Sequence, residues 1–344
     1  MIPSAQRCIL LRAYPQGVPR ARDFELVERP ITPPGEGQVL VEVRYLSLDP
    51  APRLRMNPLS RDVPPLPLGS VVVGRGVGIV RASQHADWHV GDTVSGELGW
   101  QEYATVDGAG LRRVDPSQAP LQASLGLLGP SGIAAWCLVH VAAAVQPGET
   151  VVVAAAAGAV GSTATQLARL CGARVVALVA SAAQARFAHE TLGADTAIDC
   201  TAASFPTALE AALPTGANVF LDSVGGTVHE AVLERIAVHG RIVAFGYISA
   251  YNSKGEGPQE YGRIYRLIHR RATLSGFLVG DHAARFPEVQ RELATLLRSG
   301  SLRNHETLID GLEHTPTAFA GLFSGDPIGK QLVRPRAGST GETT

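Results

Sequence analysis

The stretch VVVAAAAGAVGSTATQLARL at residues 151–170 constrains the fold more than any other part of the chain. Its apolar start predicts a buried strand over residues 150–155, and residues 156–161 predict a tight turn. From Ser162 onward the spacing predicts a helix. One face of that helix carries Ala164, Leu167, Ala168 and Cys171. Strand, turn of small residues and helix in this order form the first part of a βαβ unit.

The small side chains of the turn have a physical cause. A pyrophosphate can approach the N–H groups at a helix start only where side chains are small, and Gly161 lets helix and strand pack closely. The pattern is AxxGxxG at Ala155, Gly158 and Gly161, and its position between a strand and a helix makes it specific. The alternative is a turn needed only for packing. We interpret it as a dinucleotide site formed by Ala157, Gly158, Ala159, Val160 and Gly161.

The second half of the chain predicts an α/β fold. Strands are expected at 151–155, 174–179, 219–222 and 240–246. Helical stretches of roughly 10 to 20 residues separate them, which is βαβ repetition. The expected structure is a doubly wound parallel sheet with helices on both faces, a Rossmann domain over residues 126–302.

The first part of the chain predicts a second, β-rich domain over residues 1–125. Alternating segments at 39–45 and 71–80, punctuated by glycine, are typical of short antiparallel strands. Residues 303–334 are expected to return to this domain, with a last strand at 329–333, and residues 335–344 are expected to be a disordered tail. We expect the ligand to bind in a cleft between the two domains.

Composition excludes several classes of protein. The chain has 344 residues, of which 45% are hydrophobic and 18% charged, with a formal net charge of −1. Such a chain can form two domains and has no broad attraction for nucleic acid or anionic lipid. The sequence shows neither a secretory leader nor an apolar run of membrane-spanning length, which favours a soluble cytoplasmic protein. Cys8, Cys137, Cys171 and Cys200 form no CxxC pair, and we interpret them as small buried hydrophobic residues.

The choice of cofactor depends on the end of the second expected strand. An NAD site places a carboxylate there, about 20 residues after the last glycine. The sequence has Ser181 instead, and Arg186 follows it. A hydroxyl and a guanidinium tolerate a 2′-phosphate, so NADP is favoured over NAD, although Arg186 could equally be a solvated helix residue.

Short motifs along nearly the whole chain resemble the medium-chain dehydrogenase/reductase superfamily, specifically its zinc-free branch of prostaglandin reductases and alkenal double-bond reductases. The residues that carry this resemblance are Tyr45-Leu46-Ser47-Leu48-Asp49-Pro50 with Arg53 and Met56, Gly99-Trp100-Gln101-Glu102-Tyr103, Leu125-Gly126-Leu127-Leu128-Gly129, Ala155 to Ser162, Asp222-Ser223-Val224-Gly225-Gly226, Gly246-Tyr247-Ile248-Ser249-Ala250-Tyr251-Asn252, Gly276-Phe277-Leu278-Val279, and Gly329-Lys330.

The resemblance implies a GroES-like domain followed by a Rossmann domain, usually in a homodimer. It also implies an enzyme that uses NADPH to reduce the carbon–carbon double bond of an enone, enal or enoyl substrate. By this resemblance Tyr251 is the catalytic candidate, which donates a hydrogen bond to the substrate carbonyl. The implied cofactor contacts, beyond the turn and Arg186, are Ser131, Ser181, Gln184, Ser223, Asn252, Phe277, Leu278, Val279 and Lys330.

The chain also departs from its relatives. It has Ala183-Gln184 where they have Glu-Lys, with the lysine on the 2′-phosphate, and Cys200 where they have a tyrosine near the adenosine. Ala51 replaces an aromatic wall of the substrate pocket, and Pro327 removes an amide contact. These differences predict a changed substrate range, and they also motivate the hypothesis of a cofactor-binding protein that has lost catalysis.

No metal site is expected. Zinc enzymes of this superfamily have Gly-His-Glu where this chain has Gly69-Ser70-Val71, and His85 and His89 match a solvated loop. Hydride addition to a conjugated double bond needs no Lewis acid if the developing enolate accepts a hydrogen bond. Tyr251 and the ribose hydroxyl of the cofactor are the candidate donors. The alternative for Tyr251 is a wall residue that only orders water, and its role could be shared or replaced by Tyr247, Tyr261 or Tyr265. A quinone reductase of the same superfamily is the second enzymatic hypothesis.

Overall fold

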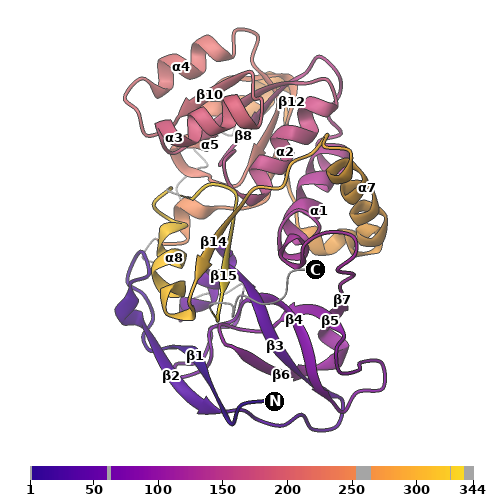
Figure 1. Cartoon of the computed structure of the whole chain (residues 1–344). Helices are drawn as coiled ribbons and strands as arrows, with labels where there is room; N and C mark the ends of the chain where they lie inside the picture. Colours follow the sequence, from indigo (N-terminus) through magenta and orange to yellow (C-terminus); the bar gives the residue numbers. More distant parts are fainter. Residues whose placement is uncertain (1, 60–62, 253–264, 326, 337–344) are drawn as a thin grey trace. The chain divides into compact units, whose positions relative to one another are not determined.

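The computed structural model describes residues 2–59, 63–252, 265–325 and 327–336. They form two compact units (Figure 1). The first unit comprises the ranges 1–126, 306–324 and 330–344, and the second comprises 127–305 and 325–329.

The first unit is built mainly from antiparallel strands. Its strands in the described residues are β1 (Ala5–Leu11), β2 (Phe24–Pro30), β3 (Gln38–Ser47), β4 (Arg75–Ser83), β5 (Thr93–Glu97), β6 (Tyr103–Asp107), β7 (Arg112–Arg113), β14 (Glu306–Asp310) and β15 (Lys330–Arg334). β1 pairs with β2, and the others form one sheet in the order β14-β15-β3-β4-β5-β7 with β6 added on β3. Only the β14–β15 pair is parallel among these described strands. The expected β-rich domain is confirmed.

Aromatic side chains close the core of this unit. Trp100 is 1% exposed, and its ring centroid lies 5.4 Å from that of Phe24 and 5.2 Å from that of Phe319. Phe319 belongs to helix α8 (Thr315–Gly321), so the C-terminal part of the chain contributes to the core of the N-terminal part. The core therefore forms only after segments far apart in the sequence have met.

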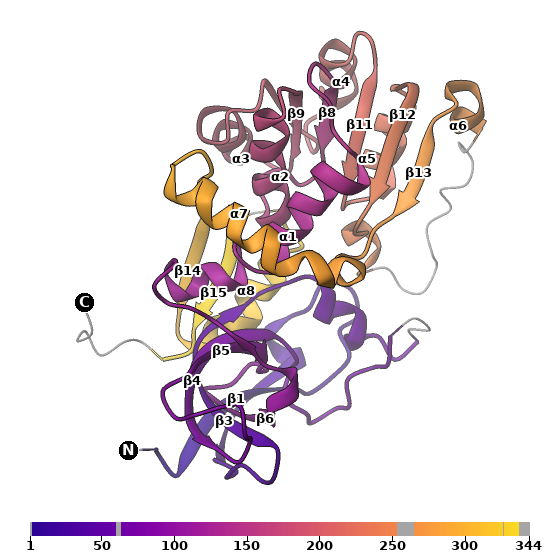
Figure 2. The same cartoon turned by 90° about the vertical axis from the view of Figure 1, so that its right-hand side faces the viewer.

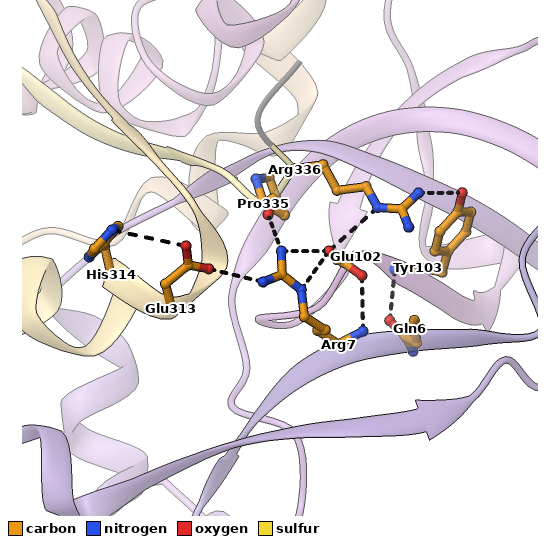
Figure 3. A network of polar contacts seen from close by, with 8 residues as sticks. All are labelled: Gln6, Arg7, Glu102, Tyr103, Glu313, His314, Pro335 and Arg336. Atoms are coloured by element: carbon orange, nitrogen blue, oxygen red, sulfur yellow. Dashed lines mark hydrogen bonds and ion pairs between the residues drawn. The ribbon is translucent and has the colours of Figure 1, made fainter. Parts of the chain in front are cut away.

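A polar network at the end of β1 adds a second connection between the chain's ends (Figure 3). Glu102 is 3% exposed, and its carboxylate accepts bonds from the Arg7 backbone N–H at 2.9 Å and the Arg7 Nε at 3.0 Å. The Arg7 guanidinium also reaches Glu313 at 3.2 Å and the Pro335 carbonyl at 3.3 Å. Arg336 lies 3.4 Å from the Glu102 carboxylate. Pro335 and Arg336, assigned to the tail by the sequence, thus take part in the fold, and residues 337–344 lie outside the described residues.

The second unit contains a parallel sheet. Its described strands are β8 (Thr150–Val153), β9 (Arg174–Val179), β10 (Thr196–Asp199), β11 (Ala217–Asp222), β12 (Ile236–Ala244) and β13 (Thr273–Gly276). Their order is β10-β9-β8-β11-β12-β13, with every neighbouring pair parallel. The chain order therefore reverses between β8 and β11, the position where ligands bind in open α/β sheets. This is the doubly wound sheet that the sequence predicted.

Helices cover both faces of this sheet. They are α1 (Pro130–Cys137), α2 (Ala159–Leu170), α3 (Ala182–Arg186), α4 (Phe205–Ala212), α5 (Gly226–Leu233), α6 (Tyr265–Arg270) and α7 (Phe286–Arg298). Figures 1 and 2 show α1, α2 and α7 together on one face and α4 and α5 on the other. Among the described residues, no helix combines the length and apolar character needed to cross a bilayer.

Two local expectations need correction. Helix α2 begins at Ala159 rather than Ser162, because Gly158 already takes the extended N-cap conformation and shortens the turn. Cys8 and Cys137 are buried as expected, whereas Cys171 and Cys200 are only partly buried. Both of these lie just beyond a helix or strand end, where the backbone approaches the surface.

Candidate functional site

The turn between β8 and α2 exposes the start of a helix. Gly158 is the N-cap residue, with φ −80° and ψ 179°, and it has no side chain to cap the helix. The first N–H groups of a helix have no carbonyl partner within it, so those of Ala159, Val160 and Gly161 are directed outward. Together with the helix dipole they form a suitable cradle for an anion.

Gly161 is required by close packing of helix and strand. A Cβ at this position would lie 2.3 Å from the carbonyl oxygen of Ala155 and 2.8 Å from the Cα of Ala156. At Gly158 an added Cβ would meet only the Ala155 carbonyl oxygen, at 3.2 Å. The two glycines thus differ. Gly161 permits the close packing of helix and strand, and Gly158 leaves space in front of the helix start.

Residues 325 and 327–329, which we call the return segment, pack against this turn within the second unit. The N–H of Gly329 donates to the Ala157 carbonyl oxygen at 2.7 Å, and Gly329 pairs with Gly158 as an isolated parallel bridge. Gly329 has φ +69°, a conformation that favours glycine. The return segment therefore borders the predicted dinucleotide turn.

The residues predicted to contact the adenosine part of the cofactor follow β9 and lie in different environments. Ser181 is the N-cap of α3, and its hydroxyl oxygen accepts from the Gln184 N–H at 3.3 Å. The Gln184 side chain is 6% exposed and bonds only to backbone groups, those of Ala180, Gly325 and Pro327. Arg186 is exposed at the end of this short helix. Its guanidinium is therefore the accessible positive charge of α3.

At the end of β11 side chains hold the backbone that leads into α5. Asp222 is 2% exposed, and its carboxylate accepts from the N–H groups of Val224 at 2.9 Å and Gly225 at 3.0 Å. The second carboxylate oxygen lies 2.8 Å from Nδ1 of His229. The next N–H, that of Gly226, donates to the Tyr247 phenol oxygen at 3.3 Å. Of the two helix starts beside the strand reversal, that of α2 follows the bare Gly158, whereas the first N–H of α5 is bonded to the Tyr247 phenol.

His229 and the role of Asp222 were not expected from the sequence. The available signal was an aspartate at a strand end, a Gly-Gly helix start and a histidine in the first turn of that helix. Helical geometry brings such a histidine back toward the strand end. Asp222 thus has a structural role, because its carboxylate holds the backbone turn between β11 and α5.

The loop after β12 brings Tyr251 to the same edge of the sheet. The N–H groups of Ile248 and Ser249 donate to the carbonyl oxygens of Ser223 and Val224, both at 3.1 Å. Ser223 is thus placed at this loop through its backbone. The Tyr247 ring lies on Gly225, where an added Cβ would come within 2.0 Å of the ring. These contacts fix the loop that carries the predicted catalytic tyrosine.

Tyr251 is the most chemically distinctive group of this loop. Burial raises the pKa of its phenol above the ordinary value of 10.0, although a hydrogen bond from the Tyr247 backbone acts in the opposite direction. An oxygen that accepts this N–H keeps its own O–H proton for another acceptor. Asn252 follows directly, and residues 253–264, which include Tyr261, lie outside the described residues.

The remaining predicted cofactor residues occupy three places. Phe277 follows β13, where its N–H donates to the Ala244 carbonyl at 2.9 Å and its ring stacks on His282. Leu278 is 72% exposed, and Val279 begins a short 3-10 helix. Ser131 lies in the first turn of α1 and is buried. The parallel sheet thus brings the turn, Ser181, Ser223, Tyr251 and Phe277 to the carboxyl ends of its strands.

Lys330 belongs to the first unit, where its buried side chain pairs with the partly exposed Asp49. Its ammonium contacts Asp49 and donates to the Leu48 carbonyl at 3.2 Å, and the Ser47 hydroxyl donates to Asp49 at 2.5 Å. Burial alone would raise the pKa of the Asp49 carboxyl, but the Lys330 charge and these hydrogen bonds hold it below 3.8. The ammonium is therefore committed to Asp49 within its own unit.

The described residues do not fit a zinc site. No group of three or more His, Cys, Asp or Glu side chains among them could hold a metal ion. The His85 ring nitrogen Nδ1 accepts from the Asp87 N–H at 3.1 Å, and His89 is 79% exposed at its side chain. Their contacts are those of a surface loop.

Comparisons with known proteins agree with this architecture. Residues 7–114 match the family described as the N-terminal domain of oxidoreductase, and residues 159–295 match the zinc-binding dehydrogenase family. The chain is 37% identical to the NADPH-dependent curcumin reductase of Escherichia coli (strain K12) over 94% of its length and 95% of that protein. It is 33% identical to the NADP(+)-dependent 2-alkenal reductase of Nicotiana tabacum over 94% of its length and 96% of that protein.

The structural comparison points the same way. CurA from Vibrio vulnificus, solved in complex with NADPH, superimposes with a TM-score of 0.90 at 36% identity, covering 96% of this chain and 100% of that one. Sequence and fold are thus similar over nearly the full length of both chains. The chain belongs to the medium-chain dehydrogenase/reductase superfamily, in the branch of the prostaglandin reductases and alkenal double-bond reductases.

Proposed function

We propose that this protein is an NADPH-dependent reductase of the carbon–carbon double bond of α,β-unsaturated carbonyl compounds. The observation that carries the proposal is the open start of α2 at the strand reversal, on the same sheet edge as the partly buried Tyr251 phenol. The relatives named above, which reduce curcumin and 2-alkenals, support this class of substrate.

The open helix start supports a dinucleotide cofactor. In this proposal the pyrophosphate binds the N–H groups of residues 159–161, with Ala157 and Gly158 leaving the space for it. Ser181 and the exposed Arg186 face the 2′-phosphate of NADPH, since no acidic residue follows β9 there. Further proposed contacts are those of Ser131, Ser223, Asn252, Phe277, Leu278 and Val279.

Tyr251 has the chemical properties that the reaction needs. Bound NADPH supplies a hydride, which adds to the β-carbon of the conjugated double bond. Negative charge then develops on the carbonyl oxygen, and the Tyr251 O–H can donate to it because its oxygen already accepts the Tyr247 N–H. A proton from Tyr251 or water then reaches the α-carbon and completes the reduction. The raised pKa keeps this phenol protonated at neutral pH.

Replacement of Tyr251 by phenylalanine tests this role. We expect kcat to fall by about 100-fold with a smaller change in KM, because the lost hydrogen bond strengthens as the enolate forms. Ionisation of this phenol should not halve the wild-type rate below pH 10, since burial raises its pKa above 10.0. Steady-state rates between about pH 6 and 10 measure both effects. Tyr265→Phe, which alters a 45% exposed tyrosine, is the control, and equal rates in all three proteins would exclude Tyr251 as the donor.

The substrate class can be tested directly. NADPH absorbance is followed with enals, enones, enoyl thioesters and quinones, and with NADH in place of NADPH. The proposal predicts oxidation of NADPH by conjugated carbonyl compounds. Turnover of quinones alone would identify a quinone reductase. Tight NADPH binding without any turnover would instead support a protein that has lost catalysis.

We further propose that the protein acts as a homodimer. Strand β13 is the last strand of the parallel sheet in the described part of the chain, and all four of its residues are exposed. Leu274 is 45% exposed on it, and Leu278, which follows it, is 72% exposed. Pairing of this edge with a second copy would cover both. Light scattering of the full chain should give twice the monomer mass of 36.1 kDa, and the monomer mass would refute the proposal.

A further inference from the structure

We propose that Gln184 is a positioning residue, which holds the return segment against the dinucleotide turn and makes no contact with the cofactor. This inference rests on the proposed function, because the turn is taken to bind NADPH. The observations that carry it are hydrogen bonds within the second unit. The resemblance places Gln184 among the cofactor contacts, at a position where relatives have a lysine.

The hydrogen-bonding groups of Gln184 are already used. Nε2 donates to the carbonyl oxygens of Gly325 at 2.6 Å and Pro327 at 2.7 Å, and Oε1 accepts from the Ala180 N–H at 3.0 Å. An amide nitrogen has two donors, so neither is left for a phosphate. The side chain is also only 6% exposed. Binding of the 2′-phosphate would require it to abandon both carbonyls, which would then be unpaired.

The same segment is tied to the dinucleotide turn at its other end. Gly329 donates to the Ala157 carbonyl oxygen at 2.7 Å. Because a peptide group is planar, fixing this carbonyl also fixes the N–H of Gly158, the N-cap residue of α2. Gly325 approaches Ala180 so closely that an added Cβ would lie 2.5 Å from the Ala180 Cβ. Gln184 thus anchors one end of the segment whose other end orients the entrance to α2.

This arrangement predicts how cofactor binding responds when the amide is lost. The turn contacts the pyrophosphate, which NADPH and NADH share, so loosening the return segment should weaken both alike. Gln184→Ala is expected to raise the Kd of NADPH and of NADH by the same factor, about tenfold, the equivalent of one or two net hydrogen bonds. Arg186→Ala should instead weaken NADPH more than NADH. A change in the ratio of the two affinities therefore separates the two roles.

The experiment compares the full-length wild type with Gln184→Ala, Gln184→Met, Arg186→Ala and Gln166→Ala. Gln184→Met keeps most of the side-chain volume while removing the hydrogen bonds, so it serves if the alanine variant folds poorly. Gln166 is the matched control: it is 8% exposed, its Nε2 donates to the Arg303 carbonyl at 3.1 Å, and its Oε1 accepts from the Arg303 N–H at 2.9 Å. Its loss should lower the melting temperature and leave dinucleotide affinity unchanged. Fluorescence titration gives the Kd values. Hydrogen exchange of a peptide covering the return segment shows whether that segment is still held against the dinucleotide turn.

Equal weakening of both dinucleotides, with faster exchange of the Gly329 amide, is the expected result. Selective loss of NADPH in the Gln184 variants would overturn the inference, because it would show that the amide binds the phosphate. Unchanged affinities with faster exchange would also overturn it. If the wild type bound neither dinucleotide, the proposed function would fail. Normal exchange of the Gly329 amide in Gln184→Met would instead refute only the positioning role of Gln184.

Discussion

Gly161→Ala is expected to lower stability and to weaken dinucleotide binding by about 100-fold, the effect of displacing a binding group by roughly 1 Å. The added Cβ would lie 2.3 Å from the Ala155 carbonyl oxygen, which belongs to the backbone and cannot rotate away. Helix α2 must then move off β8, and its N–H groups move with it. The cost in the free energy of unfolding should be about 2 kcal/mol, as for other overpacked cores. Thermal unfolding and NADPH titration measure the two effects.

Gly158→Ala provides the contrast. Its Cβ would meet one atom at 3.2 Å, so the fold should tolerate it with a small shift, while the methyl group occupies the space in front of the helix start. We expect weaker dinucleotide binding with little loss of stability. Gly321→Ala in α8 adds a methyl group with no atom within 4 Å and serves as the control. If Gly161→Ala bound NADPH normally, the turn would not be the dinucleotide site.

The sequence was sufficient where a local pattern determines the structure. The strands around the turn are buried on both faces and consist of apolar runs, so β9 was expected at 174–179 and occurs there. The chemistry of the turn followed from the same reasoning, because small residues between a strand and a helix leave the room that a pyrophosphate needs. Tyr251 came from the resemblance alone, since nothing in its spacing distinguishes it from Tyr247.

Contacts between distant segments could not be predicted in this way. Gln184 looked like a substituted cofactor ligand, because its partners Gly325 and Pro327 lie 141 and 143 positions away and have no side-chain signature. The ion pair of Lys330 with Asp49 likewise joins positions 281 residues apart, and its predicted contact with the cofactor stays a prediction. In each case a buried polar group found a partner through the fold, as buried polar groups must.

The two helix starts beside the strand reversal have different surroundings. Asp222 holds the N–H groups of Val224 and Gly225 just before α5, and the Gly226 N–H donates to the Tyr247 phenol oxygen. The corresponding groups of α2 follow Gly158, which has no side chain to compete. A negative carboxylate at the neighbouring start also disfavours a second anion there.

The second large effect is expected from Arg7→Met, in the network of Figure 3. Methionine keeps an unbranched apolar stem and removes the charge, which leaves the 3% exposed Glu102 carboxylate with the backbone N–H of position 7 at 2.9 Å and the more distant Arg336 guanidinium at 3.4 Å. The Arg7 side chain is 39% exposed, so losing this half-buried pair from one side should cost about 2 kcal/mol in the free energy of unfolding, less than for a fully buried pair. Arg7 also binds Glu313 and the Pro335 carbonyl, so the C-terminal part of the chain should detach more easily.

The matched control is Arg12→Met. Arg12 follows the same strand, and its ion pair with Glu25 at 3.7 Å joins side chains that are 65% and 49% exposed, so its loss should cost less than about 1 kcal/mol. Urea unfolding of the full chain, followed by fluorescence of the buried Trp100, compares the three proteins. A double variant, Arg7→Met with Glu102→Gln, should recover part of the loss, because the uncompensated charge is then gone. Equal stability of the two arginine variants would show that burial of Glu102 adds nothing to this pair.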